Sequence, residues 1–143
     1  MEKWLGAAGI CFNDKNELLM VLEGRLEGEG KWSVPTGGVA GNETFEECVV
    51  REIGEETGFS VEVIEKLQVK SGIYEGIQIA FEVHYFGVKI IGGKAQIQDP
   101  DNLIMDIAWK SKEEVTHLEL NYPEDREYLM EQFLKNRALG FIV

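Results

Sequence analysis

The stretch GGVAGNETFEECVVREIGEETGF, Gly37–Phe59, holds six glutamates, and three of them, Glu52, Glu55 and Glu56, crowd its end. Carboxylates one helical turn apart repel one another by a few tenths of a kcal/mol, and by more where water is excluded. A segment that gathers three of them therefore needs a compensating positive charge. Which cation or side chain supplies that charge depends on how the segment folds.

The same stretch carries the start and stop signals of a helix. Thr44 and Glu47 have the capping-box spacing, in which hydroxyl and carboxylate reciprocally satisfy free backbone N–H groups. Gly58 suits the left-handed position just past a helix end. These signals predict a helix over residues 45–57.

The three glutamates continue the apolar side of this predicted helix. With about 100° of turn per residue, Val49 falls about 40° from Phe45, and the three glutamates fall within about 80° of it. The opposite, solvent-facing side holds Glu47 instead. The glutamates thus stand where apolar side chains would otherwise continue.

A hard divalent cation with oxygen ligands, Mg²⁺ or Mn²⁺, suits such a cluster, because the chain offers no His or Cys cluster that would favour zinc. A second interpretation stays open on the residues alone. The glutamates could form surface pairs with Arg51 or Lys66 at a frayed helix end.

The rest of the chain predicts a mixture of strands and helices. Apolar, β-branched or alternating runs predict strands over residues 5–12, 18–23, 59–74, 77–90 and 103–109, and residues 32–34 form a short apolar piece. Ser111 and Glu114 repeat the capping-box spacing, and Pro123 suits the first position of a last helix. The side chains of that helix that recur at helical spacing are Tyr128, Leu129, Phe133 and Leu134.

Length and charge bound the possible functions. A chain of 143 residues is expected to form one domain over residues 1–143. Its net charge of −12 disfavours binding to nucleic-acid polymers or anionic membranes. With neither a signal peptide nor an apolar run of about 20 residues, we expect a cytoplasmic protein. Cys11 and Cys48 are expected to be buried free thiols.

The acidic stretch resembles the signature of the Nudix hydrolases. That motif is Gly, five residues, Glu, seven residues, Arg-Glu, a bulky apolar residue, any residue, Glu-Glu, any residue, Gly and a bulky apolar residue. It is matched here by Gly37, Glu43, Arg51, Glu52, Ile53, Glu55, Glu56, Gly58 and Phe59. The resemblance implies an α+β fold, an α/β/α sandwich with a mixed central sheet. Two positions differ from the usual pattern: Thr36 replaces a glycine, and Phe59 is aromatic.

The resemblance also implies roles for these residues. Glu55 and Glu56 would be the principal metal ligands, and Glu52 a ligand or the general base. The backbone carbonyl of Thr36 would be a further ligand. Arg51 would pair with Glu43 and fix the loop before the helix, although a surface pair of Arg51 with Glu47 is the open alternative.

Other contacts are less determined. A further acidic ligand could come from Asp99, Asp101 or Asp106, of which Asp106 is preferred; Glu82 and His84 could also approach the site, although a satisfied, partly buried histidine is the preferred interpretation. For the substrate, Arg25 could reach a phosphate, and Trp32 or Tyr74 could stack on a base. The alternatives are a solvated Arg25 and a core role for Trp32.

The implied activity is Mg²⁺-dependent hydrolysis of a diphosphate linkage in a small nucleotide, with a nucleoside triphosphate as the first choice. Dinucleoside polyphosphates and nucleotide sugars are alternatives, while the proline associated with ADP-ribose hydrolysis in this family is missing. An inactive Nudix-fold ligand sensor is the alternative of another class, disfavoured by the intact set of acids. A homodimer, through a sheet edge or the last helix, is a possible assembly.

Overall fold

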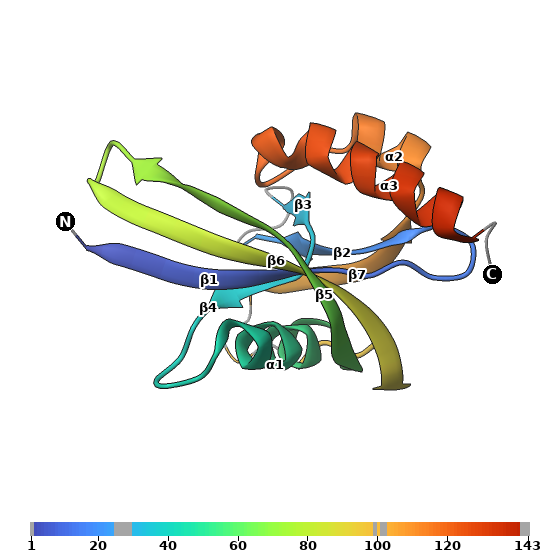
Figure 1. Cartoon of the computed structure of the whole chain (residues 1–143), viewed down its shortest axis with the longest axis horizontal. Helices are drawn as coiled ribbons and strands as arrows, with labels where there is room; N and C mark the ends of the chain where they lie inside the picture. The colour runs from blue at the N-terminus through green and yellow to red at the C-terminus, as the bar shows by residue number, and fades with distance from the viewer. Residues whose placement is uncertain (1, 25–29, 99, 101–102, 141–143) are drawn as a thin grey trace.

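The computed structural model of the chain describes residues 2–24, 30–98, 100 and 103–140. Short loops connect its strands and helices (Figure 1). In chain order they are β1 Lys3–Ile10, β2 Leu18–Glu23, β3 Lys31–Ser33, β4 Thr36–Gly38, α1 Phe45–Thr57, β5 Phe59–Tyr74, β6 Ile79–Gly93, β7 Ile104–Lys110, α2 Lys112–His117, a 3₁₀ turn Pro123–Asp125 and α3 Arg126–Gly140.

The strands form two sheets between two helical layers. The first sheet has the order β4-β1-β6-β5 and is mixed, because β1 and β6 run parallel while the other pairs are antiparallel. The second has the order β3-β2-β7 and is antiparallel. Figure 1 shows α1 on one side of the sheets and α2 and α3 on the other. The expected α+β sandwich with a mixed sheet is therefore confirmed.

Alternation along the strands builds a separate core against each helical layer. Neighbouring residues of β6 point to opposite faces, so that Phe86 packs in the core with Cys48, Val49 and Ile53 of α1. Tyr85 packs in the other core, which α3 closes. Strands buried on both faces explain why short apolar runs were strong strand signals.

The predicted helix over residues 45–57 is confirmed, with both bonds of the capping box present. Gly58 adopts the left-handed conformation, at φ 81°. The second capping box, at Ser111, begins α2, and the strand predictions hold to within a few residues. Both cysteines are buried free thiols. In the described part of the chain, no helix is long and apolar enough to cross a membrane.

The apolar side chains that recur at helical spacing in the last helix do not all face the core. Leu129 and Phe133 are buried, but Leu134 is 55% exposed. Leu134 lies about 100° further round the helix than Phe133, which turns it away from the face that packs on the sheet.

The closing of α1 by Gly58 generates a stability prediction. A Cβ at this position would lie 2.4 Å from the Lys94 carbonyl oxygen, and the left-handed backbone costs other residues roughly 1–2 kcal/mol. We expect Gly58→Ala to lower the free energy of unfolding by at least about 1–2 kcal/mol in urea titrations. Gly76→Ala is the control, because its Cβ would meet open space. Equal stability of the two variants would contradict this account of the helix end.

Candidate active site

The short strand β4 meets α1 at a glycine. A Cβ on Gly37 would lie 2.0 Å from the carboxyl carbon of Glu52, so only glycine lets the strand and this carboxylate approach so closely. The Cys48 thiol donates a hydrogen bond of 3.5 Å to the Gly37 carbonyl from the same helix. The first residue of the motif must therefore be a glycine because Glu52 of the following helix occupies the space of a side chain.

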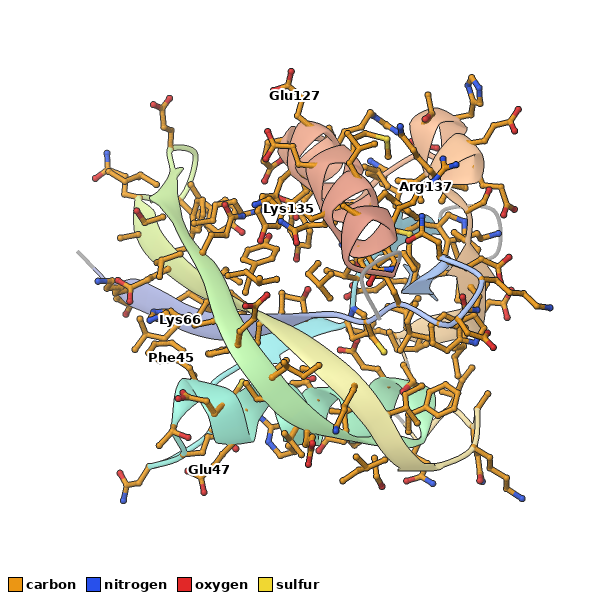
Figure 2. The ribbon with its side chains drawn as sticks, turned by 45° about the vertical axis from the view of Figure 1, so that its right-hand side comes forward. Phe45, Glu47, Lys66, Glu127, Lys135 and Arg137 are labelled. Carbon is orange, nitrogen blue, oxygen red and sulfur yellow. The ribbon has the colours of Figure 1, made fainter. Side chains whose placement is uncertain are left out.

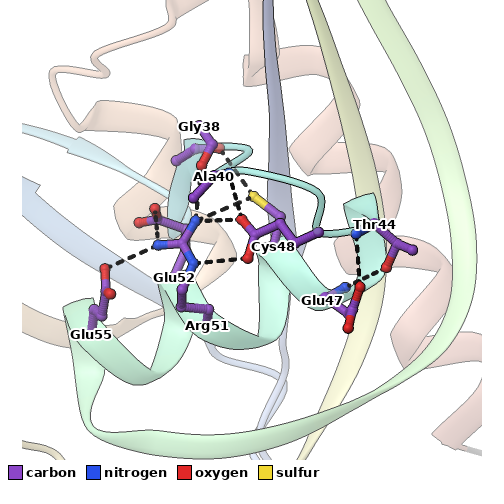
Figure 3. Close-up of polar contacts among 10 residues, drawn as sticks. Gly38, Ala40, Thr44, Glu47, Cys48, Arg51, Glu52 and Glu55 are labelled. Atoms are coloured by element: carbon purple, nitrogen blue, oxygen red, sulfur yellow. Dashed lines mark hydrogen bonds and ion pairs between the residues drawn. The ribbon is translucent and has the colours of Figure 1, made fainter.

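Arg51 connects the preceding loop to α1. Its guanidinium bonds to both carboxylate oxygens of Glu43, at 2.6 and 3.0 Å, and donates to the Gly38 carbonyl at 2.9 Å (Figure 3). Glu43 also accepts the Ala40 N–H at 2.8 Å. The hydrogen bond from Arg51 lowers the pKa of Glu43 to about 2. The expected Arg51–Glu43 pair is present and closes the loop onto the helix.

Arg51 does not pair with Glu47, which was the alternative to its pair with Glu43. Glu47 bonds to the backbone N–H of Thr44 in the capping box. Figure 2 shows Glu47 on the outer side of α1, pointing away from the sheets, which agrees with its position on the helical wheel. Lys66 takes part in none of the ion pairs found within residues 2–24, 30–98, 100 and 103–140.

Arg51 also contacts two of the clustered glutamates, Glu52 at 2.8 Å and Glu55 at 3.2 Å. The alternative interpretation, in which the glutamates pair with Arg51, is therefore correct for Glu52 and Glu55. One guanidinium nevertheless carries a single positive charge against Glu43, Glu52 and Glu55 together. Arg51 cannot neutralise the cluster, and none of its bonds reaches the remaining acid, Glu56.

Glu56 is the most buried of these acids, with 8% of its surface exposed. It accepts the Thr36 N–H at 3.3 Å. Burial, together with the neighbouring carboxyl of Glu52, raises the pKa of Glu56 to about 10. Burial raises the pKa of Glu52 as well. The raised pKa values of these two carboxyl groups mean that their surroundings lack a compensating positive charge.

These residues fit a hard divalent cation by the chemistry of their donors, which are carboxylate and carbonyl oxygens. The cradle at Gly37, which a Cβ would fill, leaves Glu52 beside the β4 backbone. Within the part of the chain that the structure describes, no three acidic, histidine or cysteine side chains already converge as a metal site. Glu52 and Glu55 each accept a hydrogen bond from Arg51 instead.

The two departures from the family pattern are both accommodated. Thr36 is not among the residues with positive φ, and its hydroxyl donates to the Val34 carbonyl at 2.8 Å. No left-handed backbone is required there, so a glycine is dispensable. Phe59 packs beside Trp109 with ring centroids 6.0 Å apart, in the core beneath α1.

The other predicted site residues are not all brought to the glutamates. Arg25, Asp99 and Asp101 lie outside the described residues. Asp106 is exposed on β7 and accepts the N–H of its neighbour Ile107 at 2.8 Å. Its role as a metal ligand stays a prediction.

The two aromatic candidates differ in their surroundings. Trp32 packs against the core closed by α3, and the Lys110 ammonium lies 4.4 Å from its ring centroid. These contacts favour the core role that was its alternative. Tyr74 is 43% exposed and lies beside Phe81, with ring centroids 4.7 Å apart. Its ring is available for stacking.

His84 is a buried histidine engaged with its neighbours. Its Nε2 lies 2.7 Å from Glu82, and its ring stacks on Phe45 at 3.5 Å between centroids. This arrangement agrees with the preferred interpretation of a largely satisfied side chain, although its Nδ1 has no hydrogen-bond partner among the residues that the structure describes.

Two residues that the fold brings near the acids were not predicted from the sequence. The charge of Glu23, at the end of β2, contributes to the raised pKa of Glu56. Tyr122 has a pKa raised by burial and by charges that include Glu23 and Glu56. The one feature of the sequence that could have indicated Glu23 is its place at the end of a predicted strand, just before a glycine-rich segment.

The Arg51 bonds generate a prediction about the loop before α1. Arg51→Lys keeps the charge but loses the planar fork that binds Glu43 and the Gly38 carbonyl. We expect about 1–3 kcal/mol loss of stability and faster amide hydrogen exchange at residues 39–43.

Arg126→Lys is the matched control for this variant. Like Arg51, Arg126 makes several hydrogen bonds, in its case to the carbonyls of Val115, Thr116 and Leu118. These bonds lie beside α2, away from the loop before α1. It should lose stability without faster exchange at residues 39–43. Unchanged exchange in Arg51→Lys would contradict the proposed closing of the loop.

Comparisons with known proteins agree with this geometry. Residues 3–133 match the NUDIX domain. Nudix hydrolase 6 of Arabidopsis thaliana is 25% identical over 138 residues, which cover 94% of this chain and 47% of that protein. The 8-oxo-dGDP phosphatase of Mus musculus is 32% identical over 72 residues, 50% of this chain and 22% of that protein. This chain therefore spans less than half the length of these curated relatives.

A solved NUDIX hydrolase from Nitrosomonas europaea has the same fold. The two superimpose with a TM-score of 0.77 at 19% identity, covering 97% of this chain and 90% of the other. The domain match extends over most of the chain, and the chain belongs to the Nudix hydrolase family.

Proposed function

We propose that the chain hydrolyses a diphosphate linkage in a small nucleotide, most simply a nucleoside triphosphate, with Mg²⁺ or Mn²⁺ as cofactor. The observation that carries this proposal is the buried Glu52–Glu56 pair beside β4, next to a single arginine that cannot balance it. The 8-oxo-dGDP phosphatase relative supports a nucleoside phosphate as substrate. Dinucleoside polyphosphates and nucleotide sugars are the competing substrates.

The acidic residues of α1 and the backbone of β4 would have different roles in this reaction. Glu55 and Glu56 would hold the ion, with the Thr36 carbonyl as a further ligand. When bound, such an ion neutralises adjacent phosphates and activates a water molecule. Glu52, which accepts a hydrogen bond from Arg51, would be a further ligand or accept the proton from that water. The Thr36 N–H orients the Glu56 carboxylate.

An intact acidic set disfavours a protein that only binds ligands. Repulsion between Glu52 and Glu56 costs free energy that a sensor without an ion would have no reason to retain. Location in the cytoplasm, formation of a homodimer and a single domain over residues 1–143 stay predictions.

The decisive experiment replaces one buried acid. Glu56→Gln keeps the shape and the hydrogen bond to Thr36 but cannot supply a negative charge to a bound ion, so we expect turnover at least about 100-fold lower. Thermal unfolding should change little, because the native carboxyl already resists ionisation. The measurement is release of phosphate or pyrophosphate from a panel of nucleoside triphosphates, dinucleoside polyphosphates and nucleotide sugars, with Mg²⁺ and with a chelator.

Glu46→Gln is the matched control on the same helix, because Glu46 is exposed. It should keep wild-type turnover, and the chelator should abolish turnover of every variant until Mg²⁺ is restored. Near wild-type rates in Glu56→Gln would refute the proposed role, and no product from any compound with Mg²⁺ would refute the proposed function.

A further inference from the structure

A hollow of about 430 Å³ lies between the C-terminal half of α3 and the middle of β5 and β6. We call it the α3 hollow. Its size is typical of small-molecule sites, which usually have volumes of about 300–1,000 Å³. Among the described residues, its lining includes none of the clustered glutamates of α1 and no residue of β4. The α3 hollow is therefore separate from the acidic site.

The α3 hollow exists because β6 carries no side chain at the position beneath α3. Phe86 and Val88 pack in the core with α1, so strand alternation directs position 87 towards α3. Gly87 occupies that position, and its φ is not positive. A Cβ there would lie 3.4 Å from Cγ of Glu65, an ordinary contact distance. The backbone thus does not require this glycine, and its effect is to leave the space open.

The neighbouring edge strand is irregular at the same point. The pairing of β5 with β6 shifts register on either side of Glu65–Lys66. These bulges leave Ile64 and Leu67 without a partner on β6, and both residues line the α3 hollow. Bulges bend a strand and change the direction of its side chains, and they are frequent beside functional sites. The irregular strand and the missing side chain therefore shape the same space.

The side of α3 that faces the α3 hollow is polar. Gln132, Lys135 and Asn136 are three and four positions apart, so they share one side of the helix, and all three line the hollow. Gln132 is only 7% exposed, yet its side-chain amide bonds to none of the described residues. Asn136, by contrast, bonds to Asn16 at 2.7 Å. Because buried amides normally have a hydrogen-bond partner, Gln132 indicates a polar ligand in the hollow.

Positive charge predominates around the α3 hollow, although the chain carries a net charge of −12. Lys66, Lys89 and Lys135 line it against a single acid, Glu65. Lys89 pairs with Glu62 at 2.9 Å. In the part of the chain that the structure describes, Lys66 and Lys135 belong to no ion pair. Figure 2 shows Lys135 on the side of α3 towards β5, where its charge is available to an anion.

The remaining walls of the α3 hollow are apolar. They come from Ile10, Phe12, Leu67 and Val88. An inorganic anion would leave these walls in contact with water, whereas an organic molecule would cover them. The combination favours a ligand that has both an apolar body and a charged group.

We propose that the α3 hollow binds a small organic anion. Its apolar body would lie over Leu67 and Val88, a polar group would bond to the Gln132 amide, and its negative charge would lie near Lys135. This inference does not rest on the proposed function, because the two sites share no lining residue.

The test uses anilinonaphthalene sulfonate, an apolar ring system with one negative charge, titrated against the whole chain by fluorescence. We expect saturable binding that octanoate displaces and octanol at equal concentration does not. Gly87→Val fills the α3 hollow, so it should weaken binding at least about 10-fold. Lys135→Glu reverses an exposed charge, so it should weaken binding roughly 5-fold or more. Urea titrations of both variants show that they fold.

Gly92→Val is the matched control for the first variant. Gly92 lies on the same strand outside the α3 hollow, and the nearest atom to its ideal Cβ is 3.9 Å away, on Ser60. Lys112→Glu is the control for the second, because it makes the same change of charge at an exposed position of α2. Both controls should bind the probe like the wild type. Glu56→Gln should also bind it normally, because its change lies in the acidic site.

Three results would overturn the proposal. They are a wild-type chain that does not bind the probe, wild-type affinity in folded Gly87→Val and Lys135→Glu, and displacement by octanol as effective as displacement by octanoate. Should Gly87→Val fail to fold, Lys135→Glu decides, since its side chain is exposed and its loss leaves no cavity. None of these results bears on hydrolysis at the acidic site, which the nucleotide panel tests independently.

Discussion

The contact between Gly37 and Glu52 is the constraint on which the candidate site depends. It fixes β4 against the inward side of α1 with no side chain between them. Once the strand lies there, the Thr36 N–H reaches Glu56 and the Gly38 carbonyl reaches Arg51. Three consecutive backbone positions thereby meet three different side chains of one helix, and a bulkier residue at position 37 would separate all of them.

The imbalance of charge follows from the same contact. Burying Glu56 under β4 raises its pKa to about 10, and burial also raises the pKa of Glu52. For such acids the folded state holds protons that the unfolded state would release, so their contribution to stability falls as pH rises from the ordinary carboxyl range towards pH 10. Arg51 offsets part of this cost but divides its bonds among Glu43, Glu52 and Glu55. The fold accepts an electrostatic penalty at the place where a cation would relieve it.

Local signals explain which parts of this structure could be predicted from the sequence. The capping boxes at Thr44 and Ser111 and the left-handed Gly58 are formed by residues a few positions apart, and they fixed the helix starts and the end of α1. The acidic side of α1 followed from helical geometry. The resemblance implied the pair of Arg51 with Glu43, but the bond of Arg51 to the Gly38 carbonyl did not follow, because the turn before the helix places that carbonyl. Glu23 was missed because only the pairing of distant strands brings it near Glu56.

The pairing of Trp4 with Phe81 shows the same limit more sharply. Trp4 and Phe81 are far apart in the sequence and meet only because β1 and β6 pair in parallel with one register. A shift of that register by one residue would send one of the rings to the face of α1. The sequence does contain the complementary signal, in the strand glycines Gly6 and Gly72, but isolated strand glycines indicate a close approach without saying to what. β4 contacts both groups of side chains: Gly37 accommodates a carboxylate, and Gly38 lies beside an indole. One three-residue strand therefore couples the position of the ring surface to that of the acids.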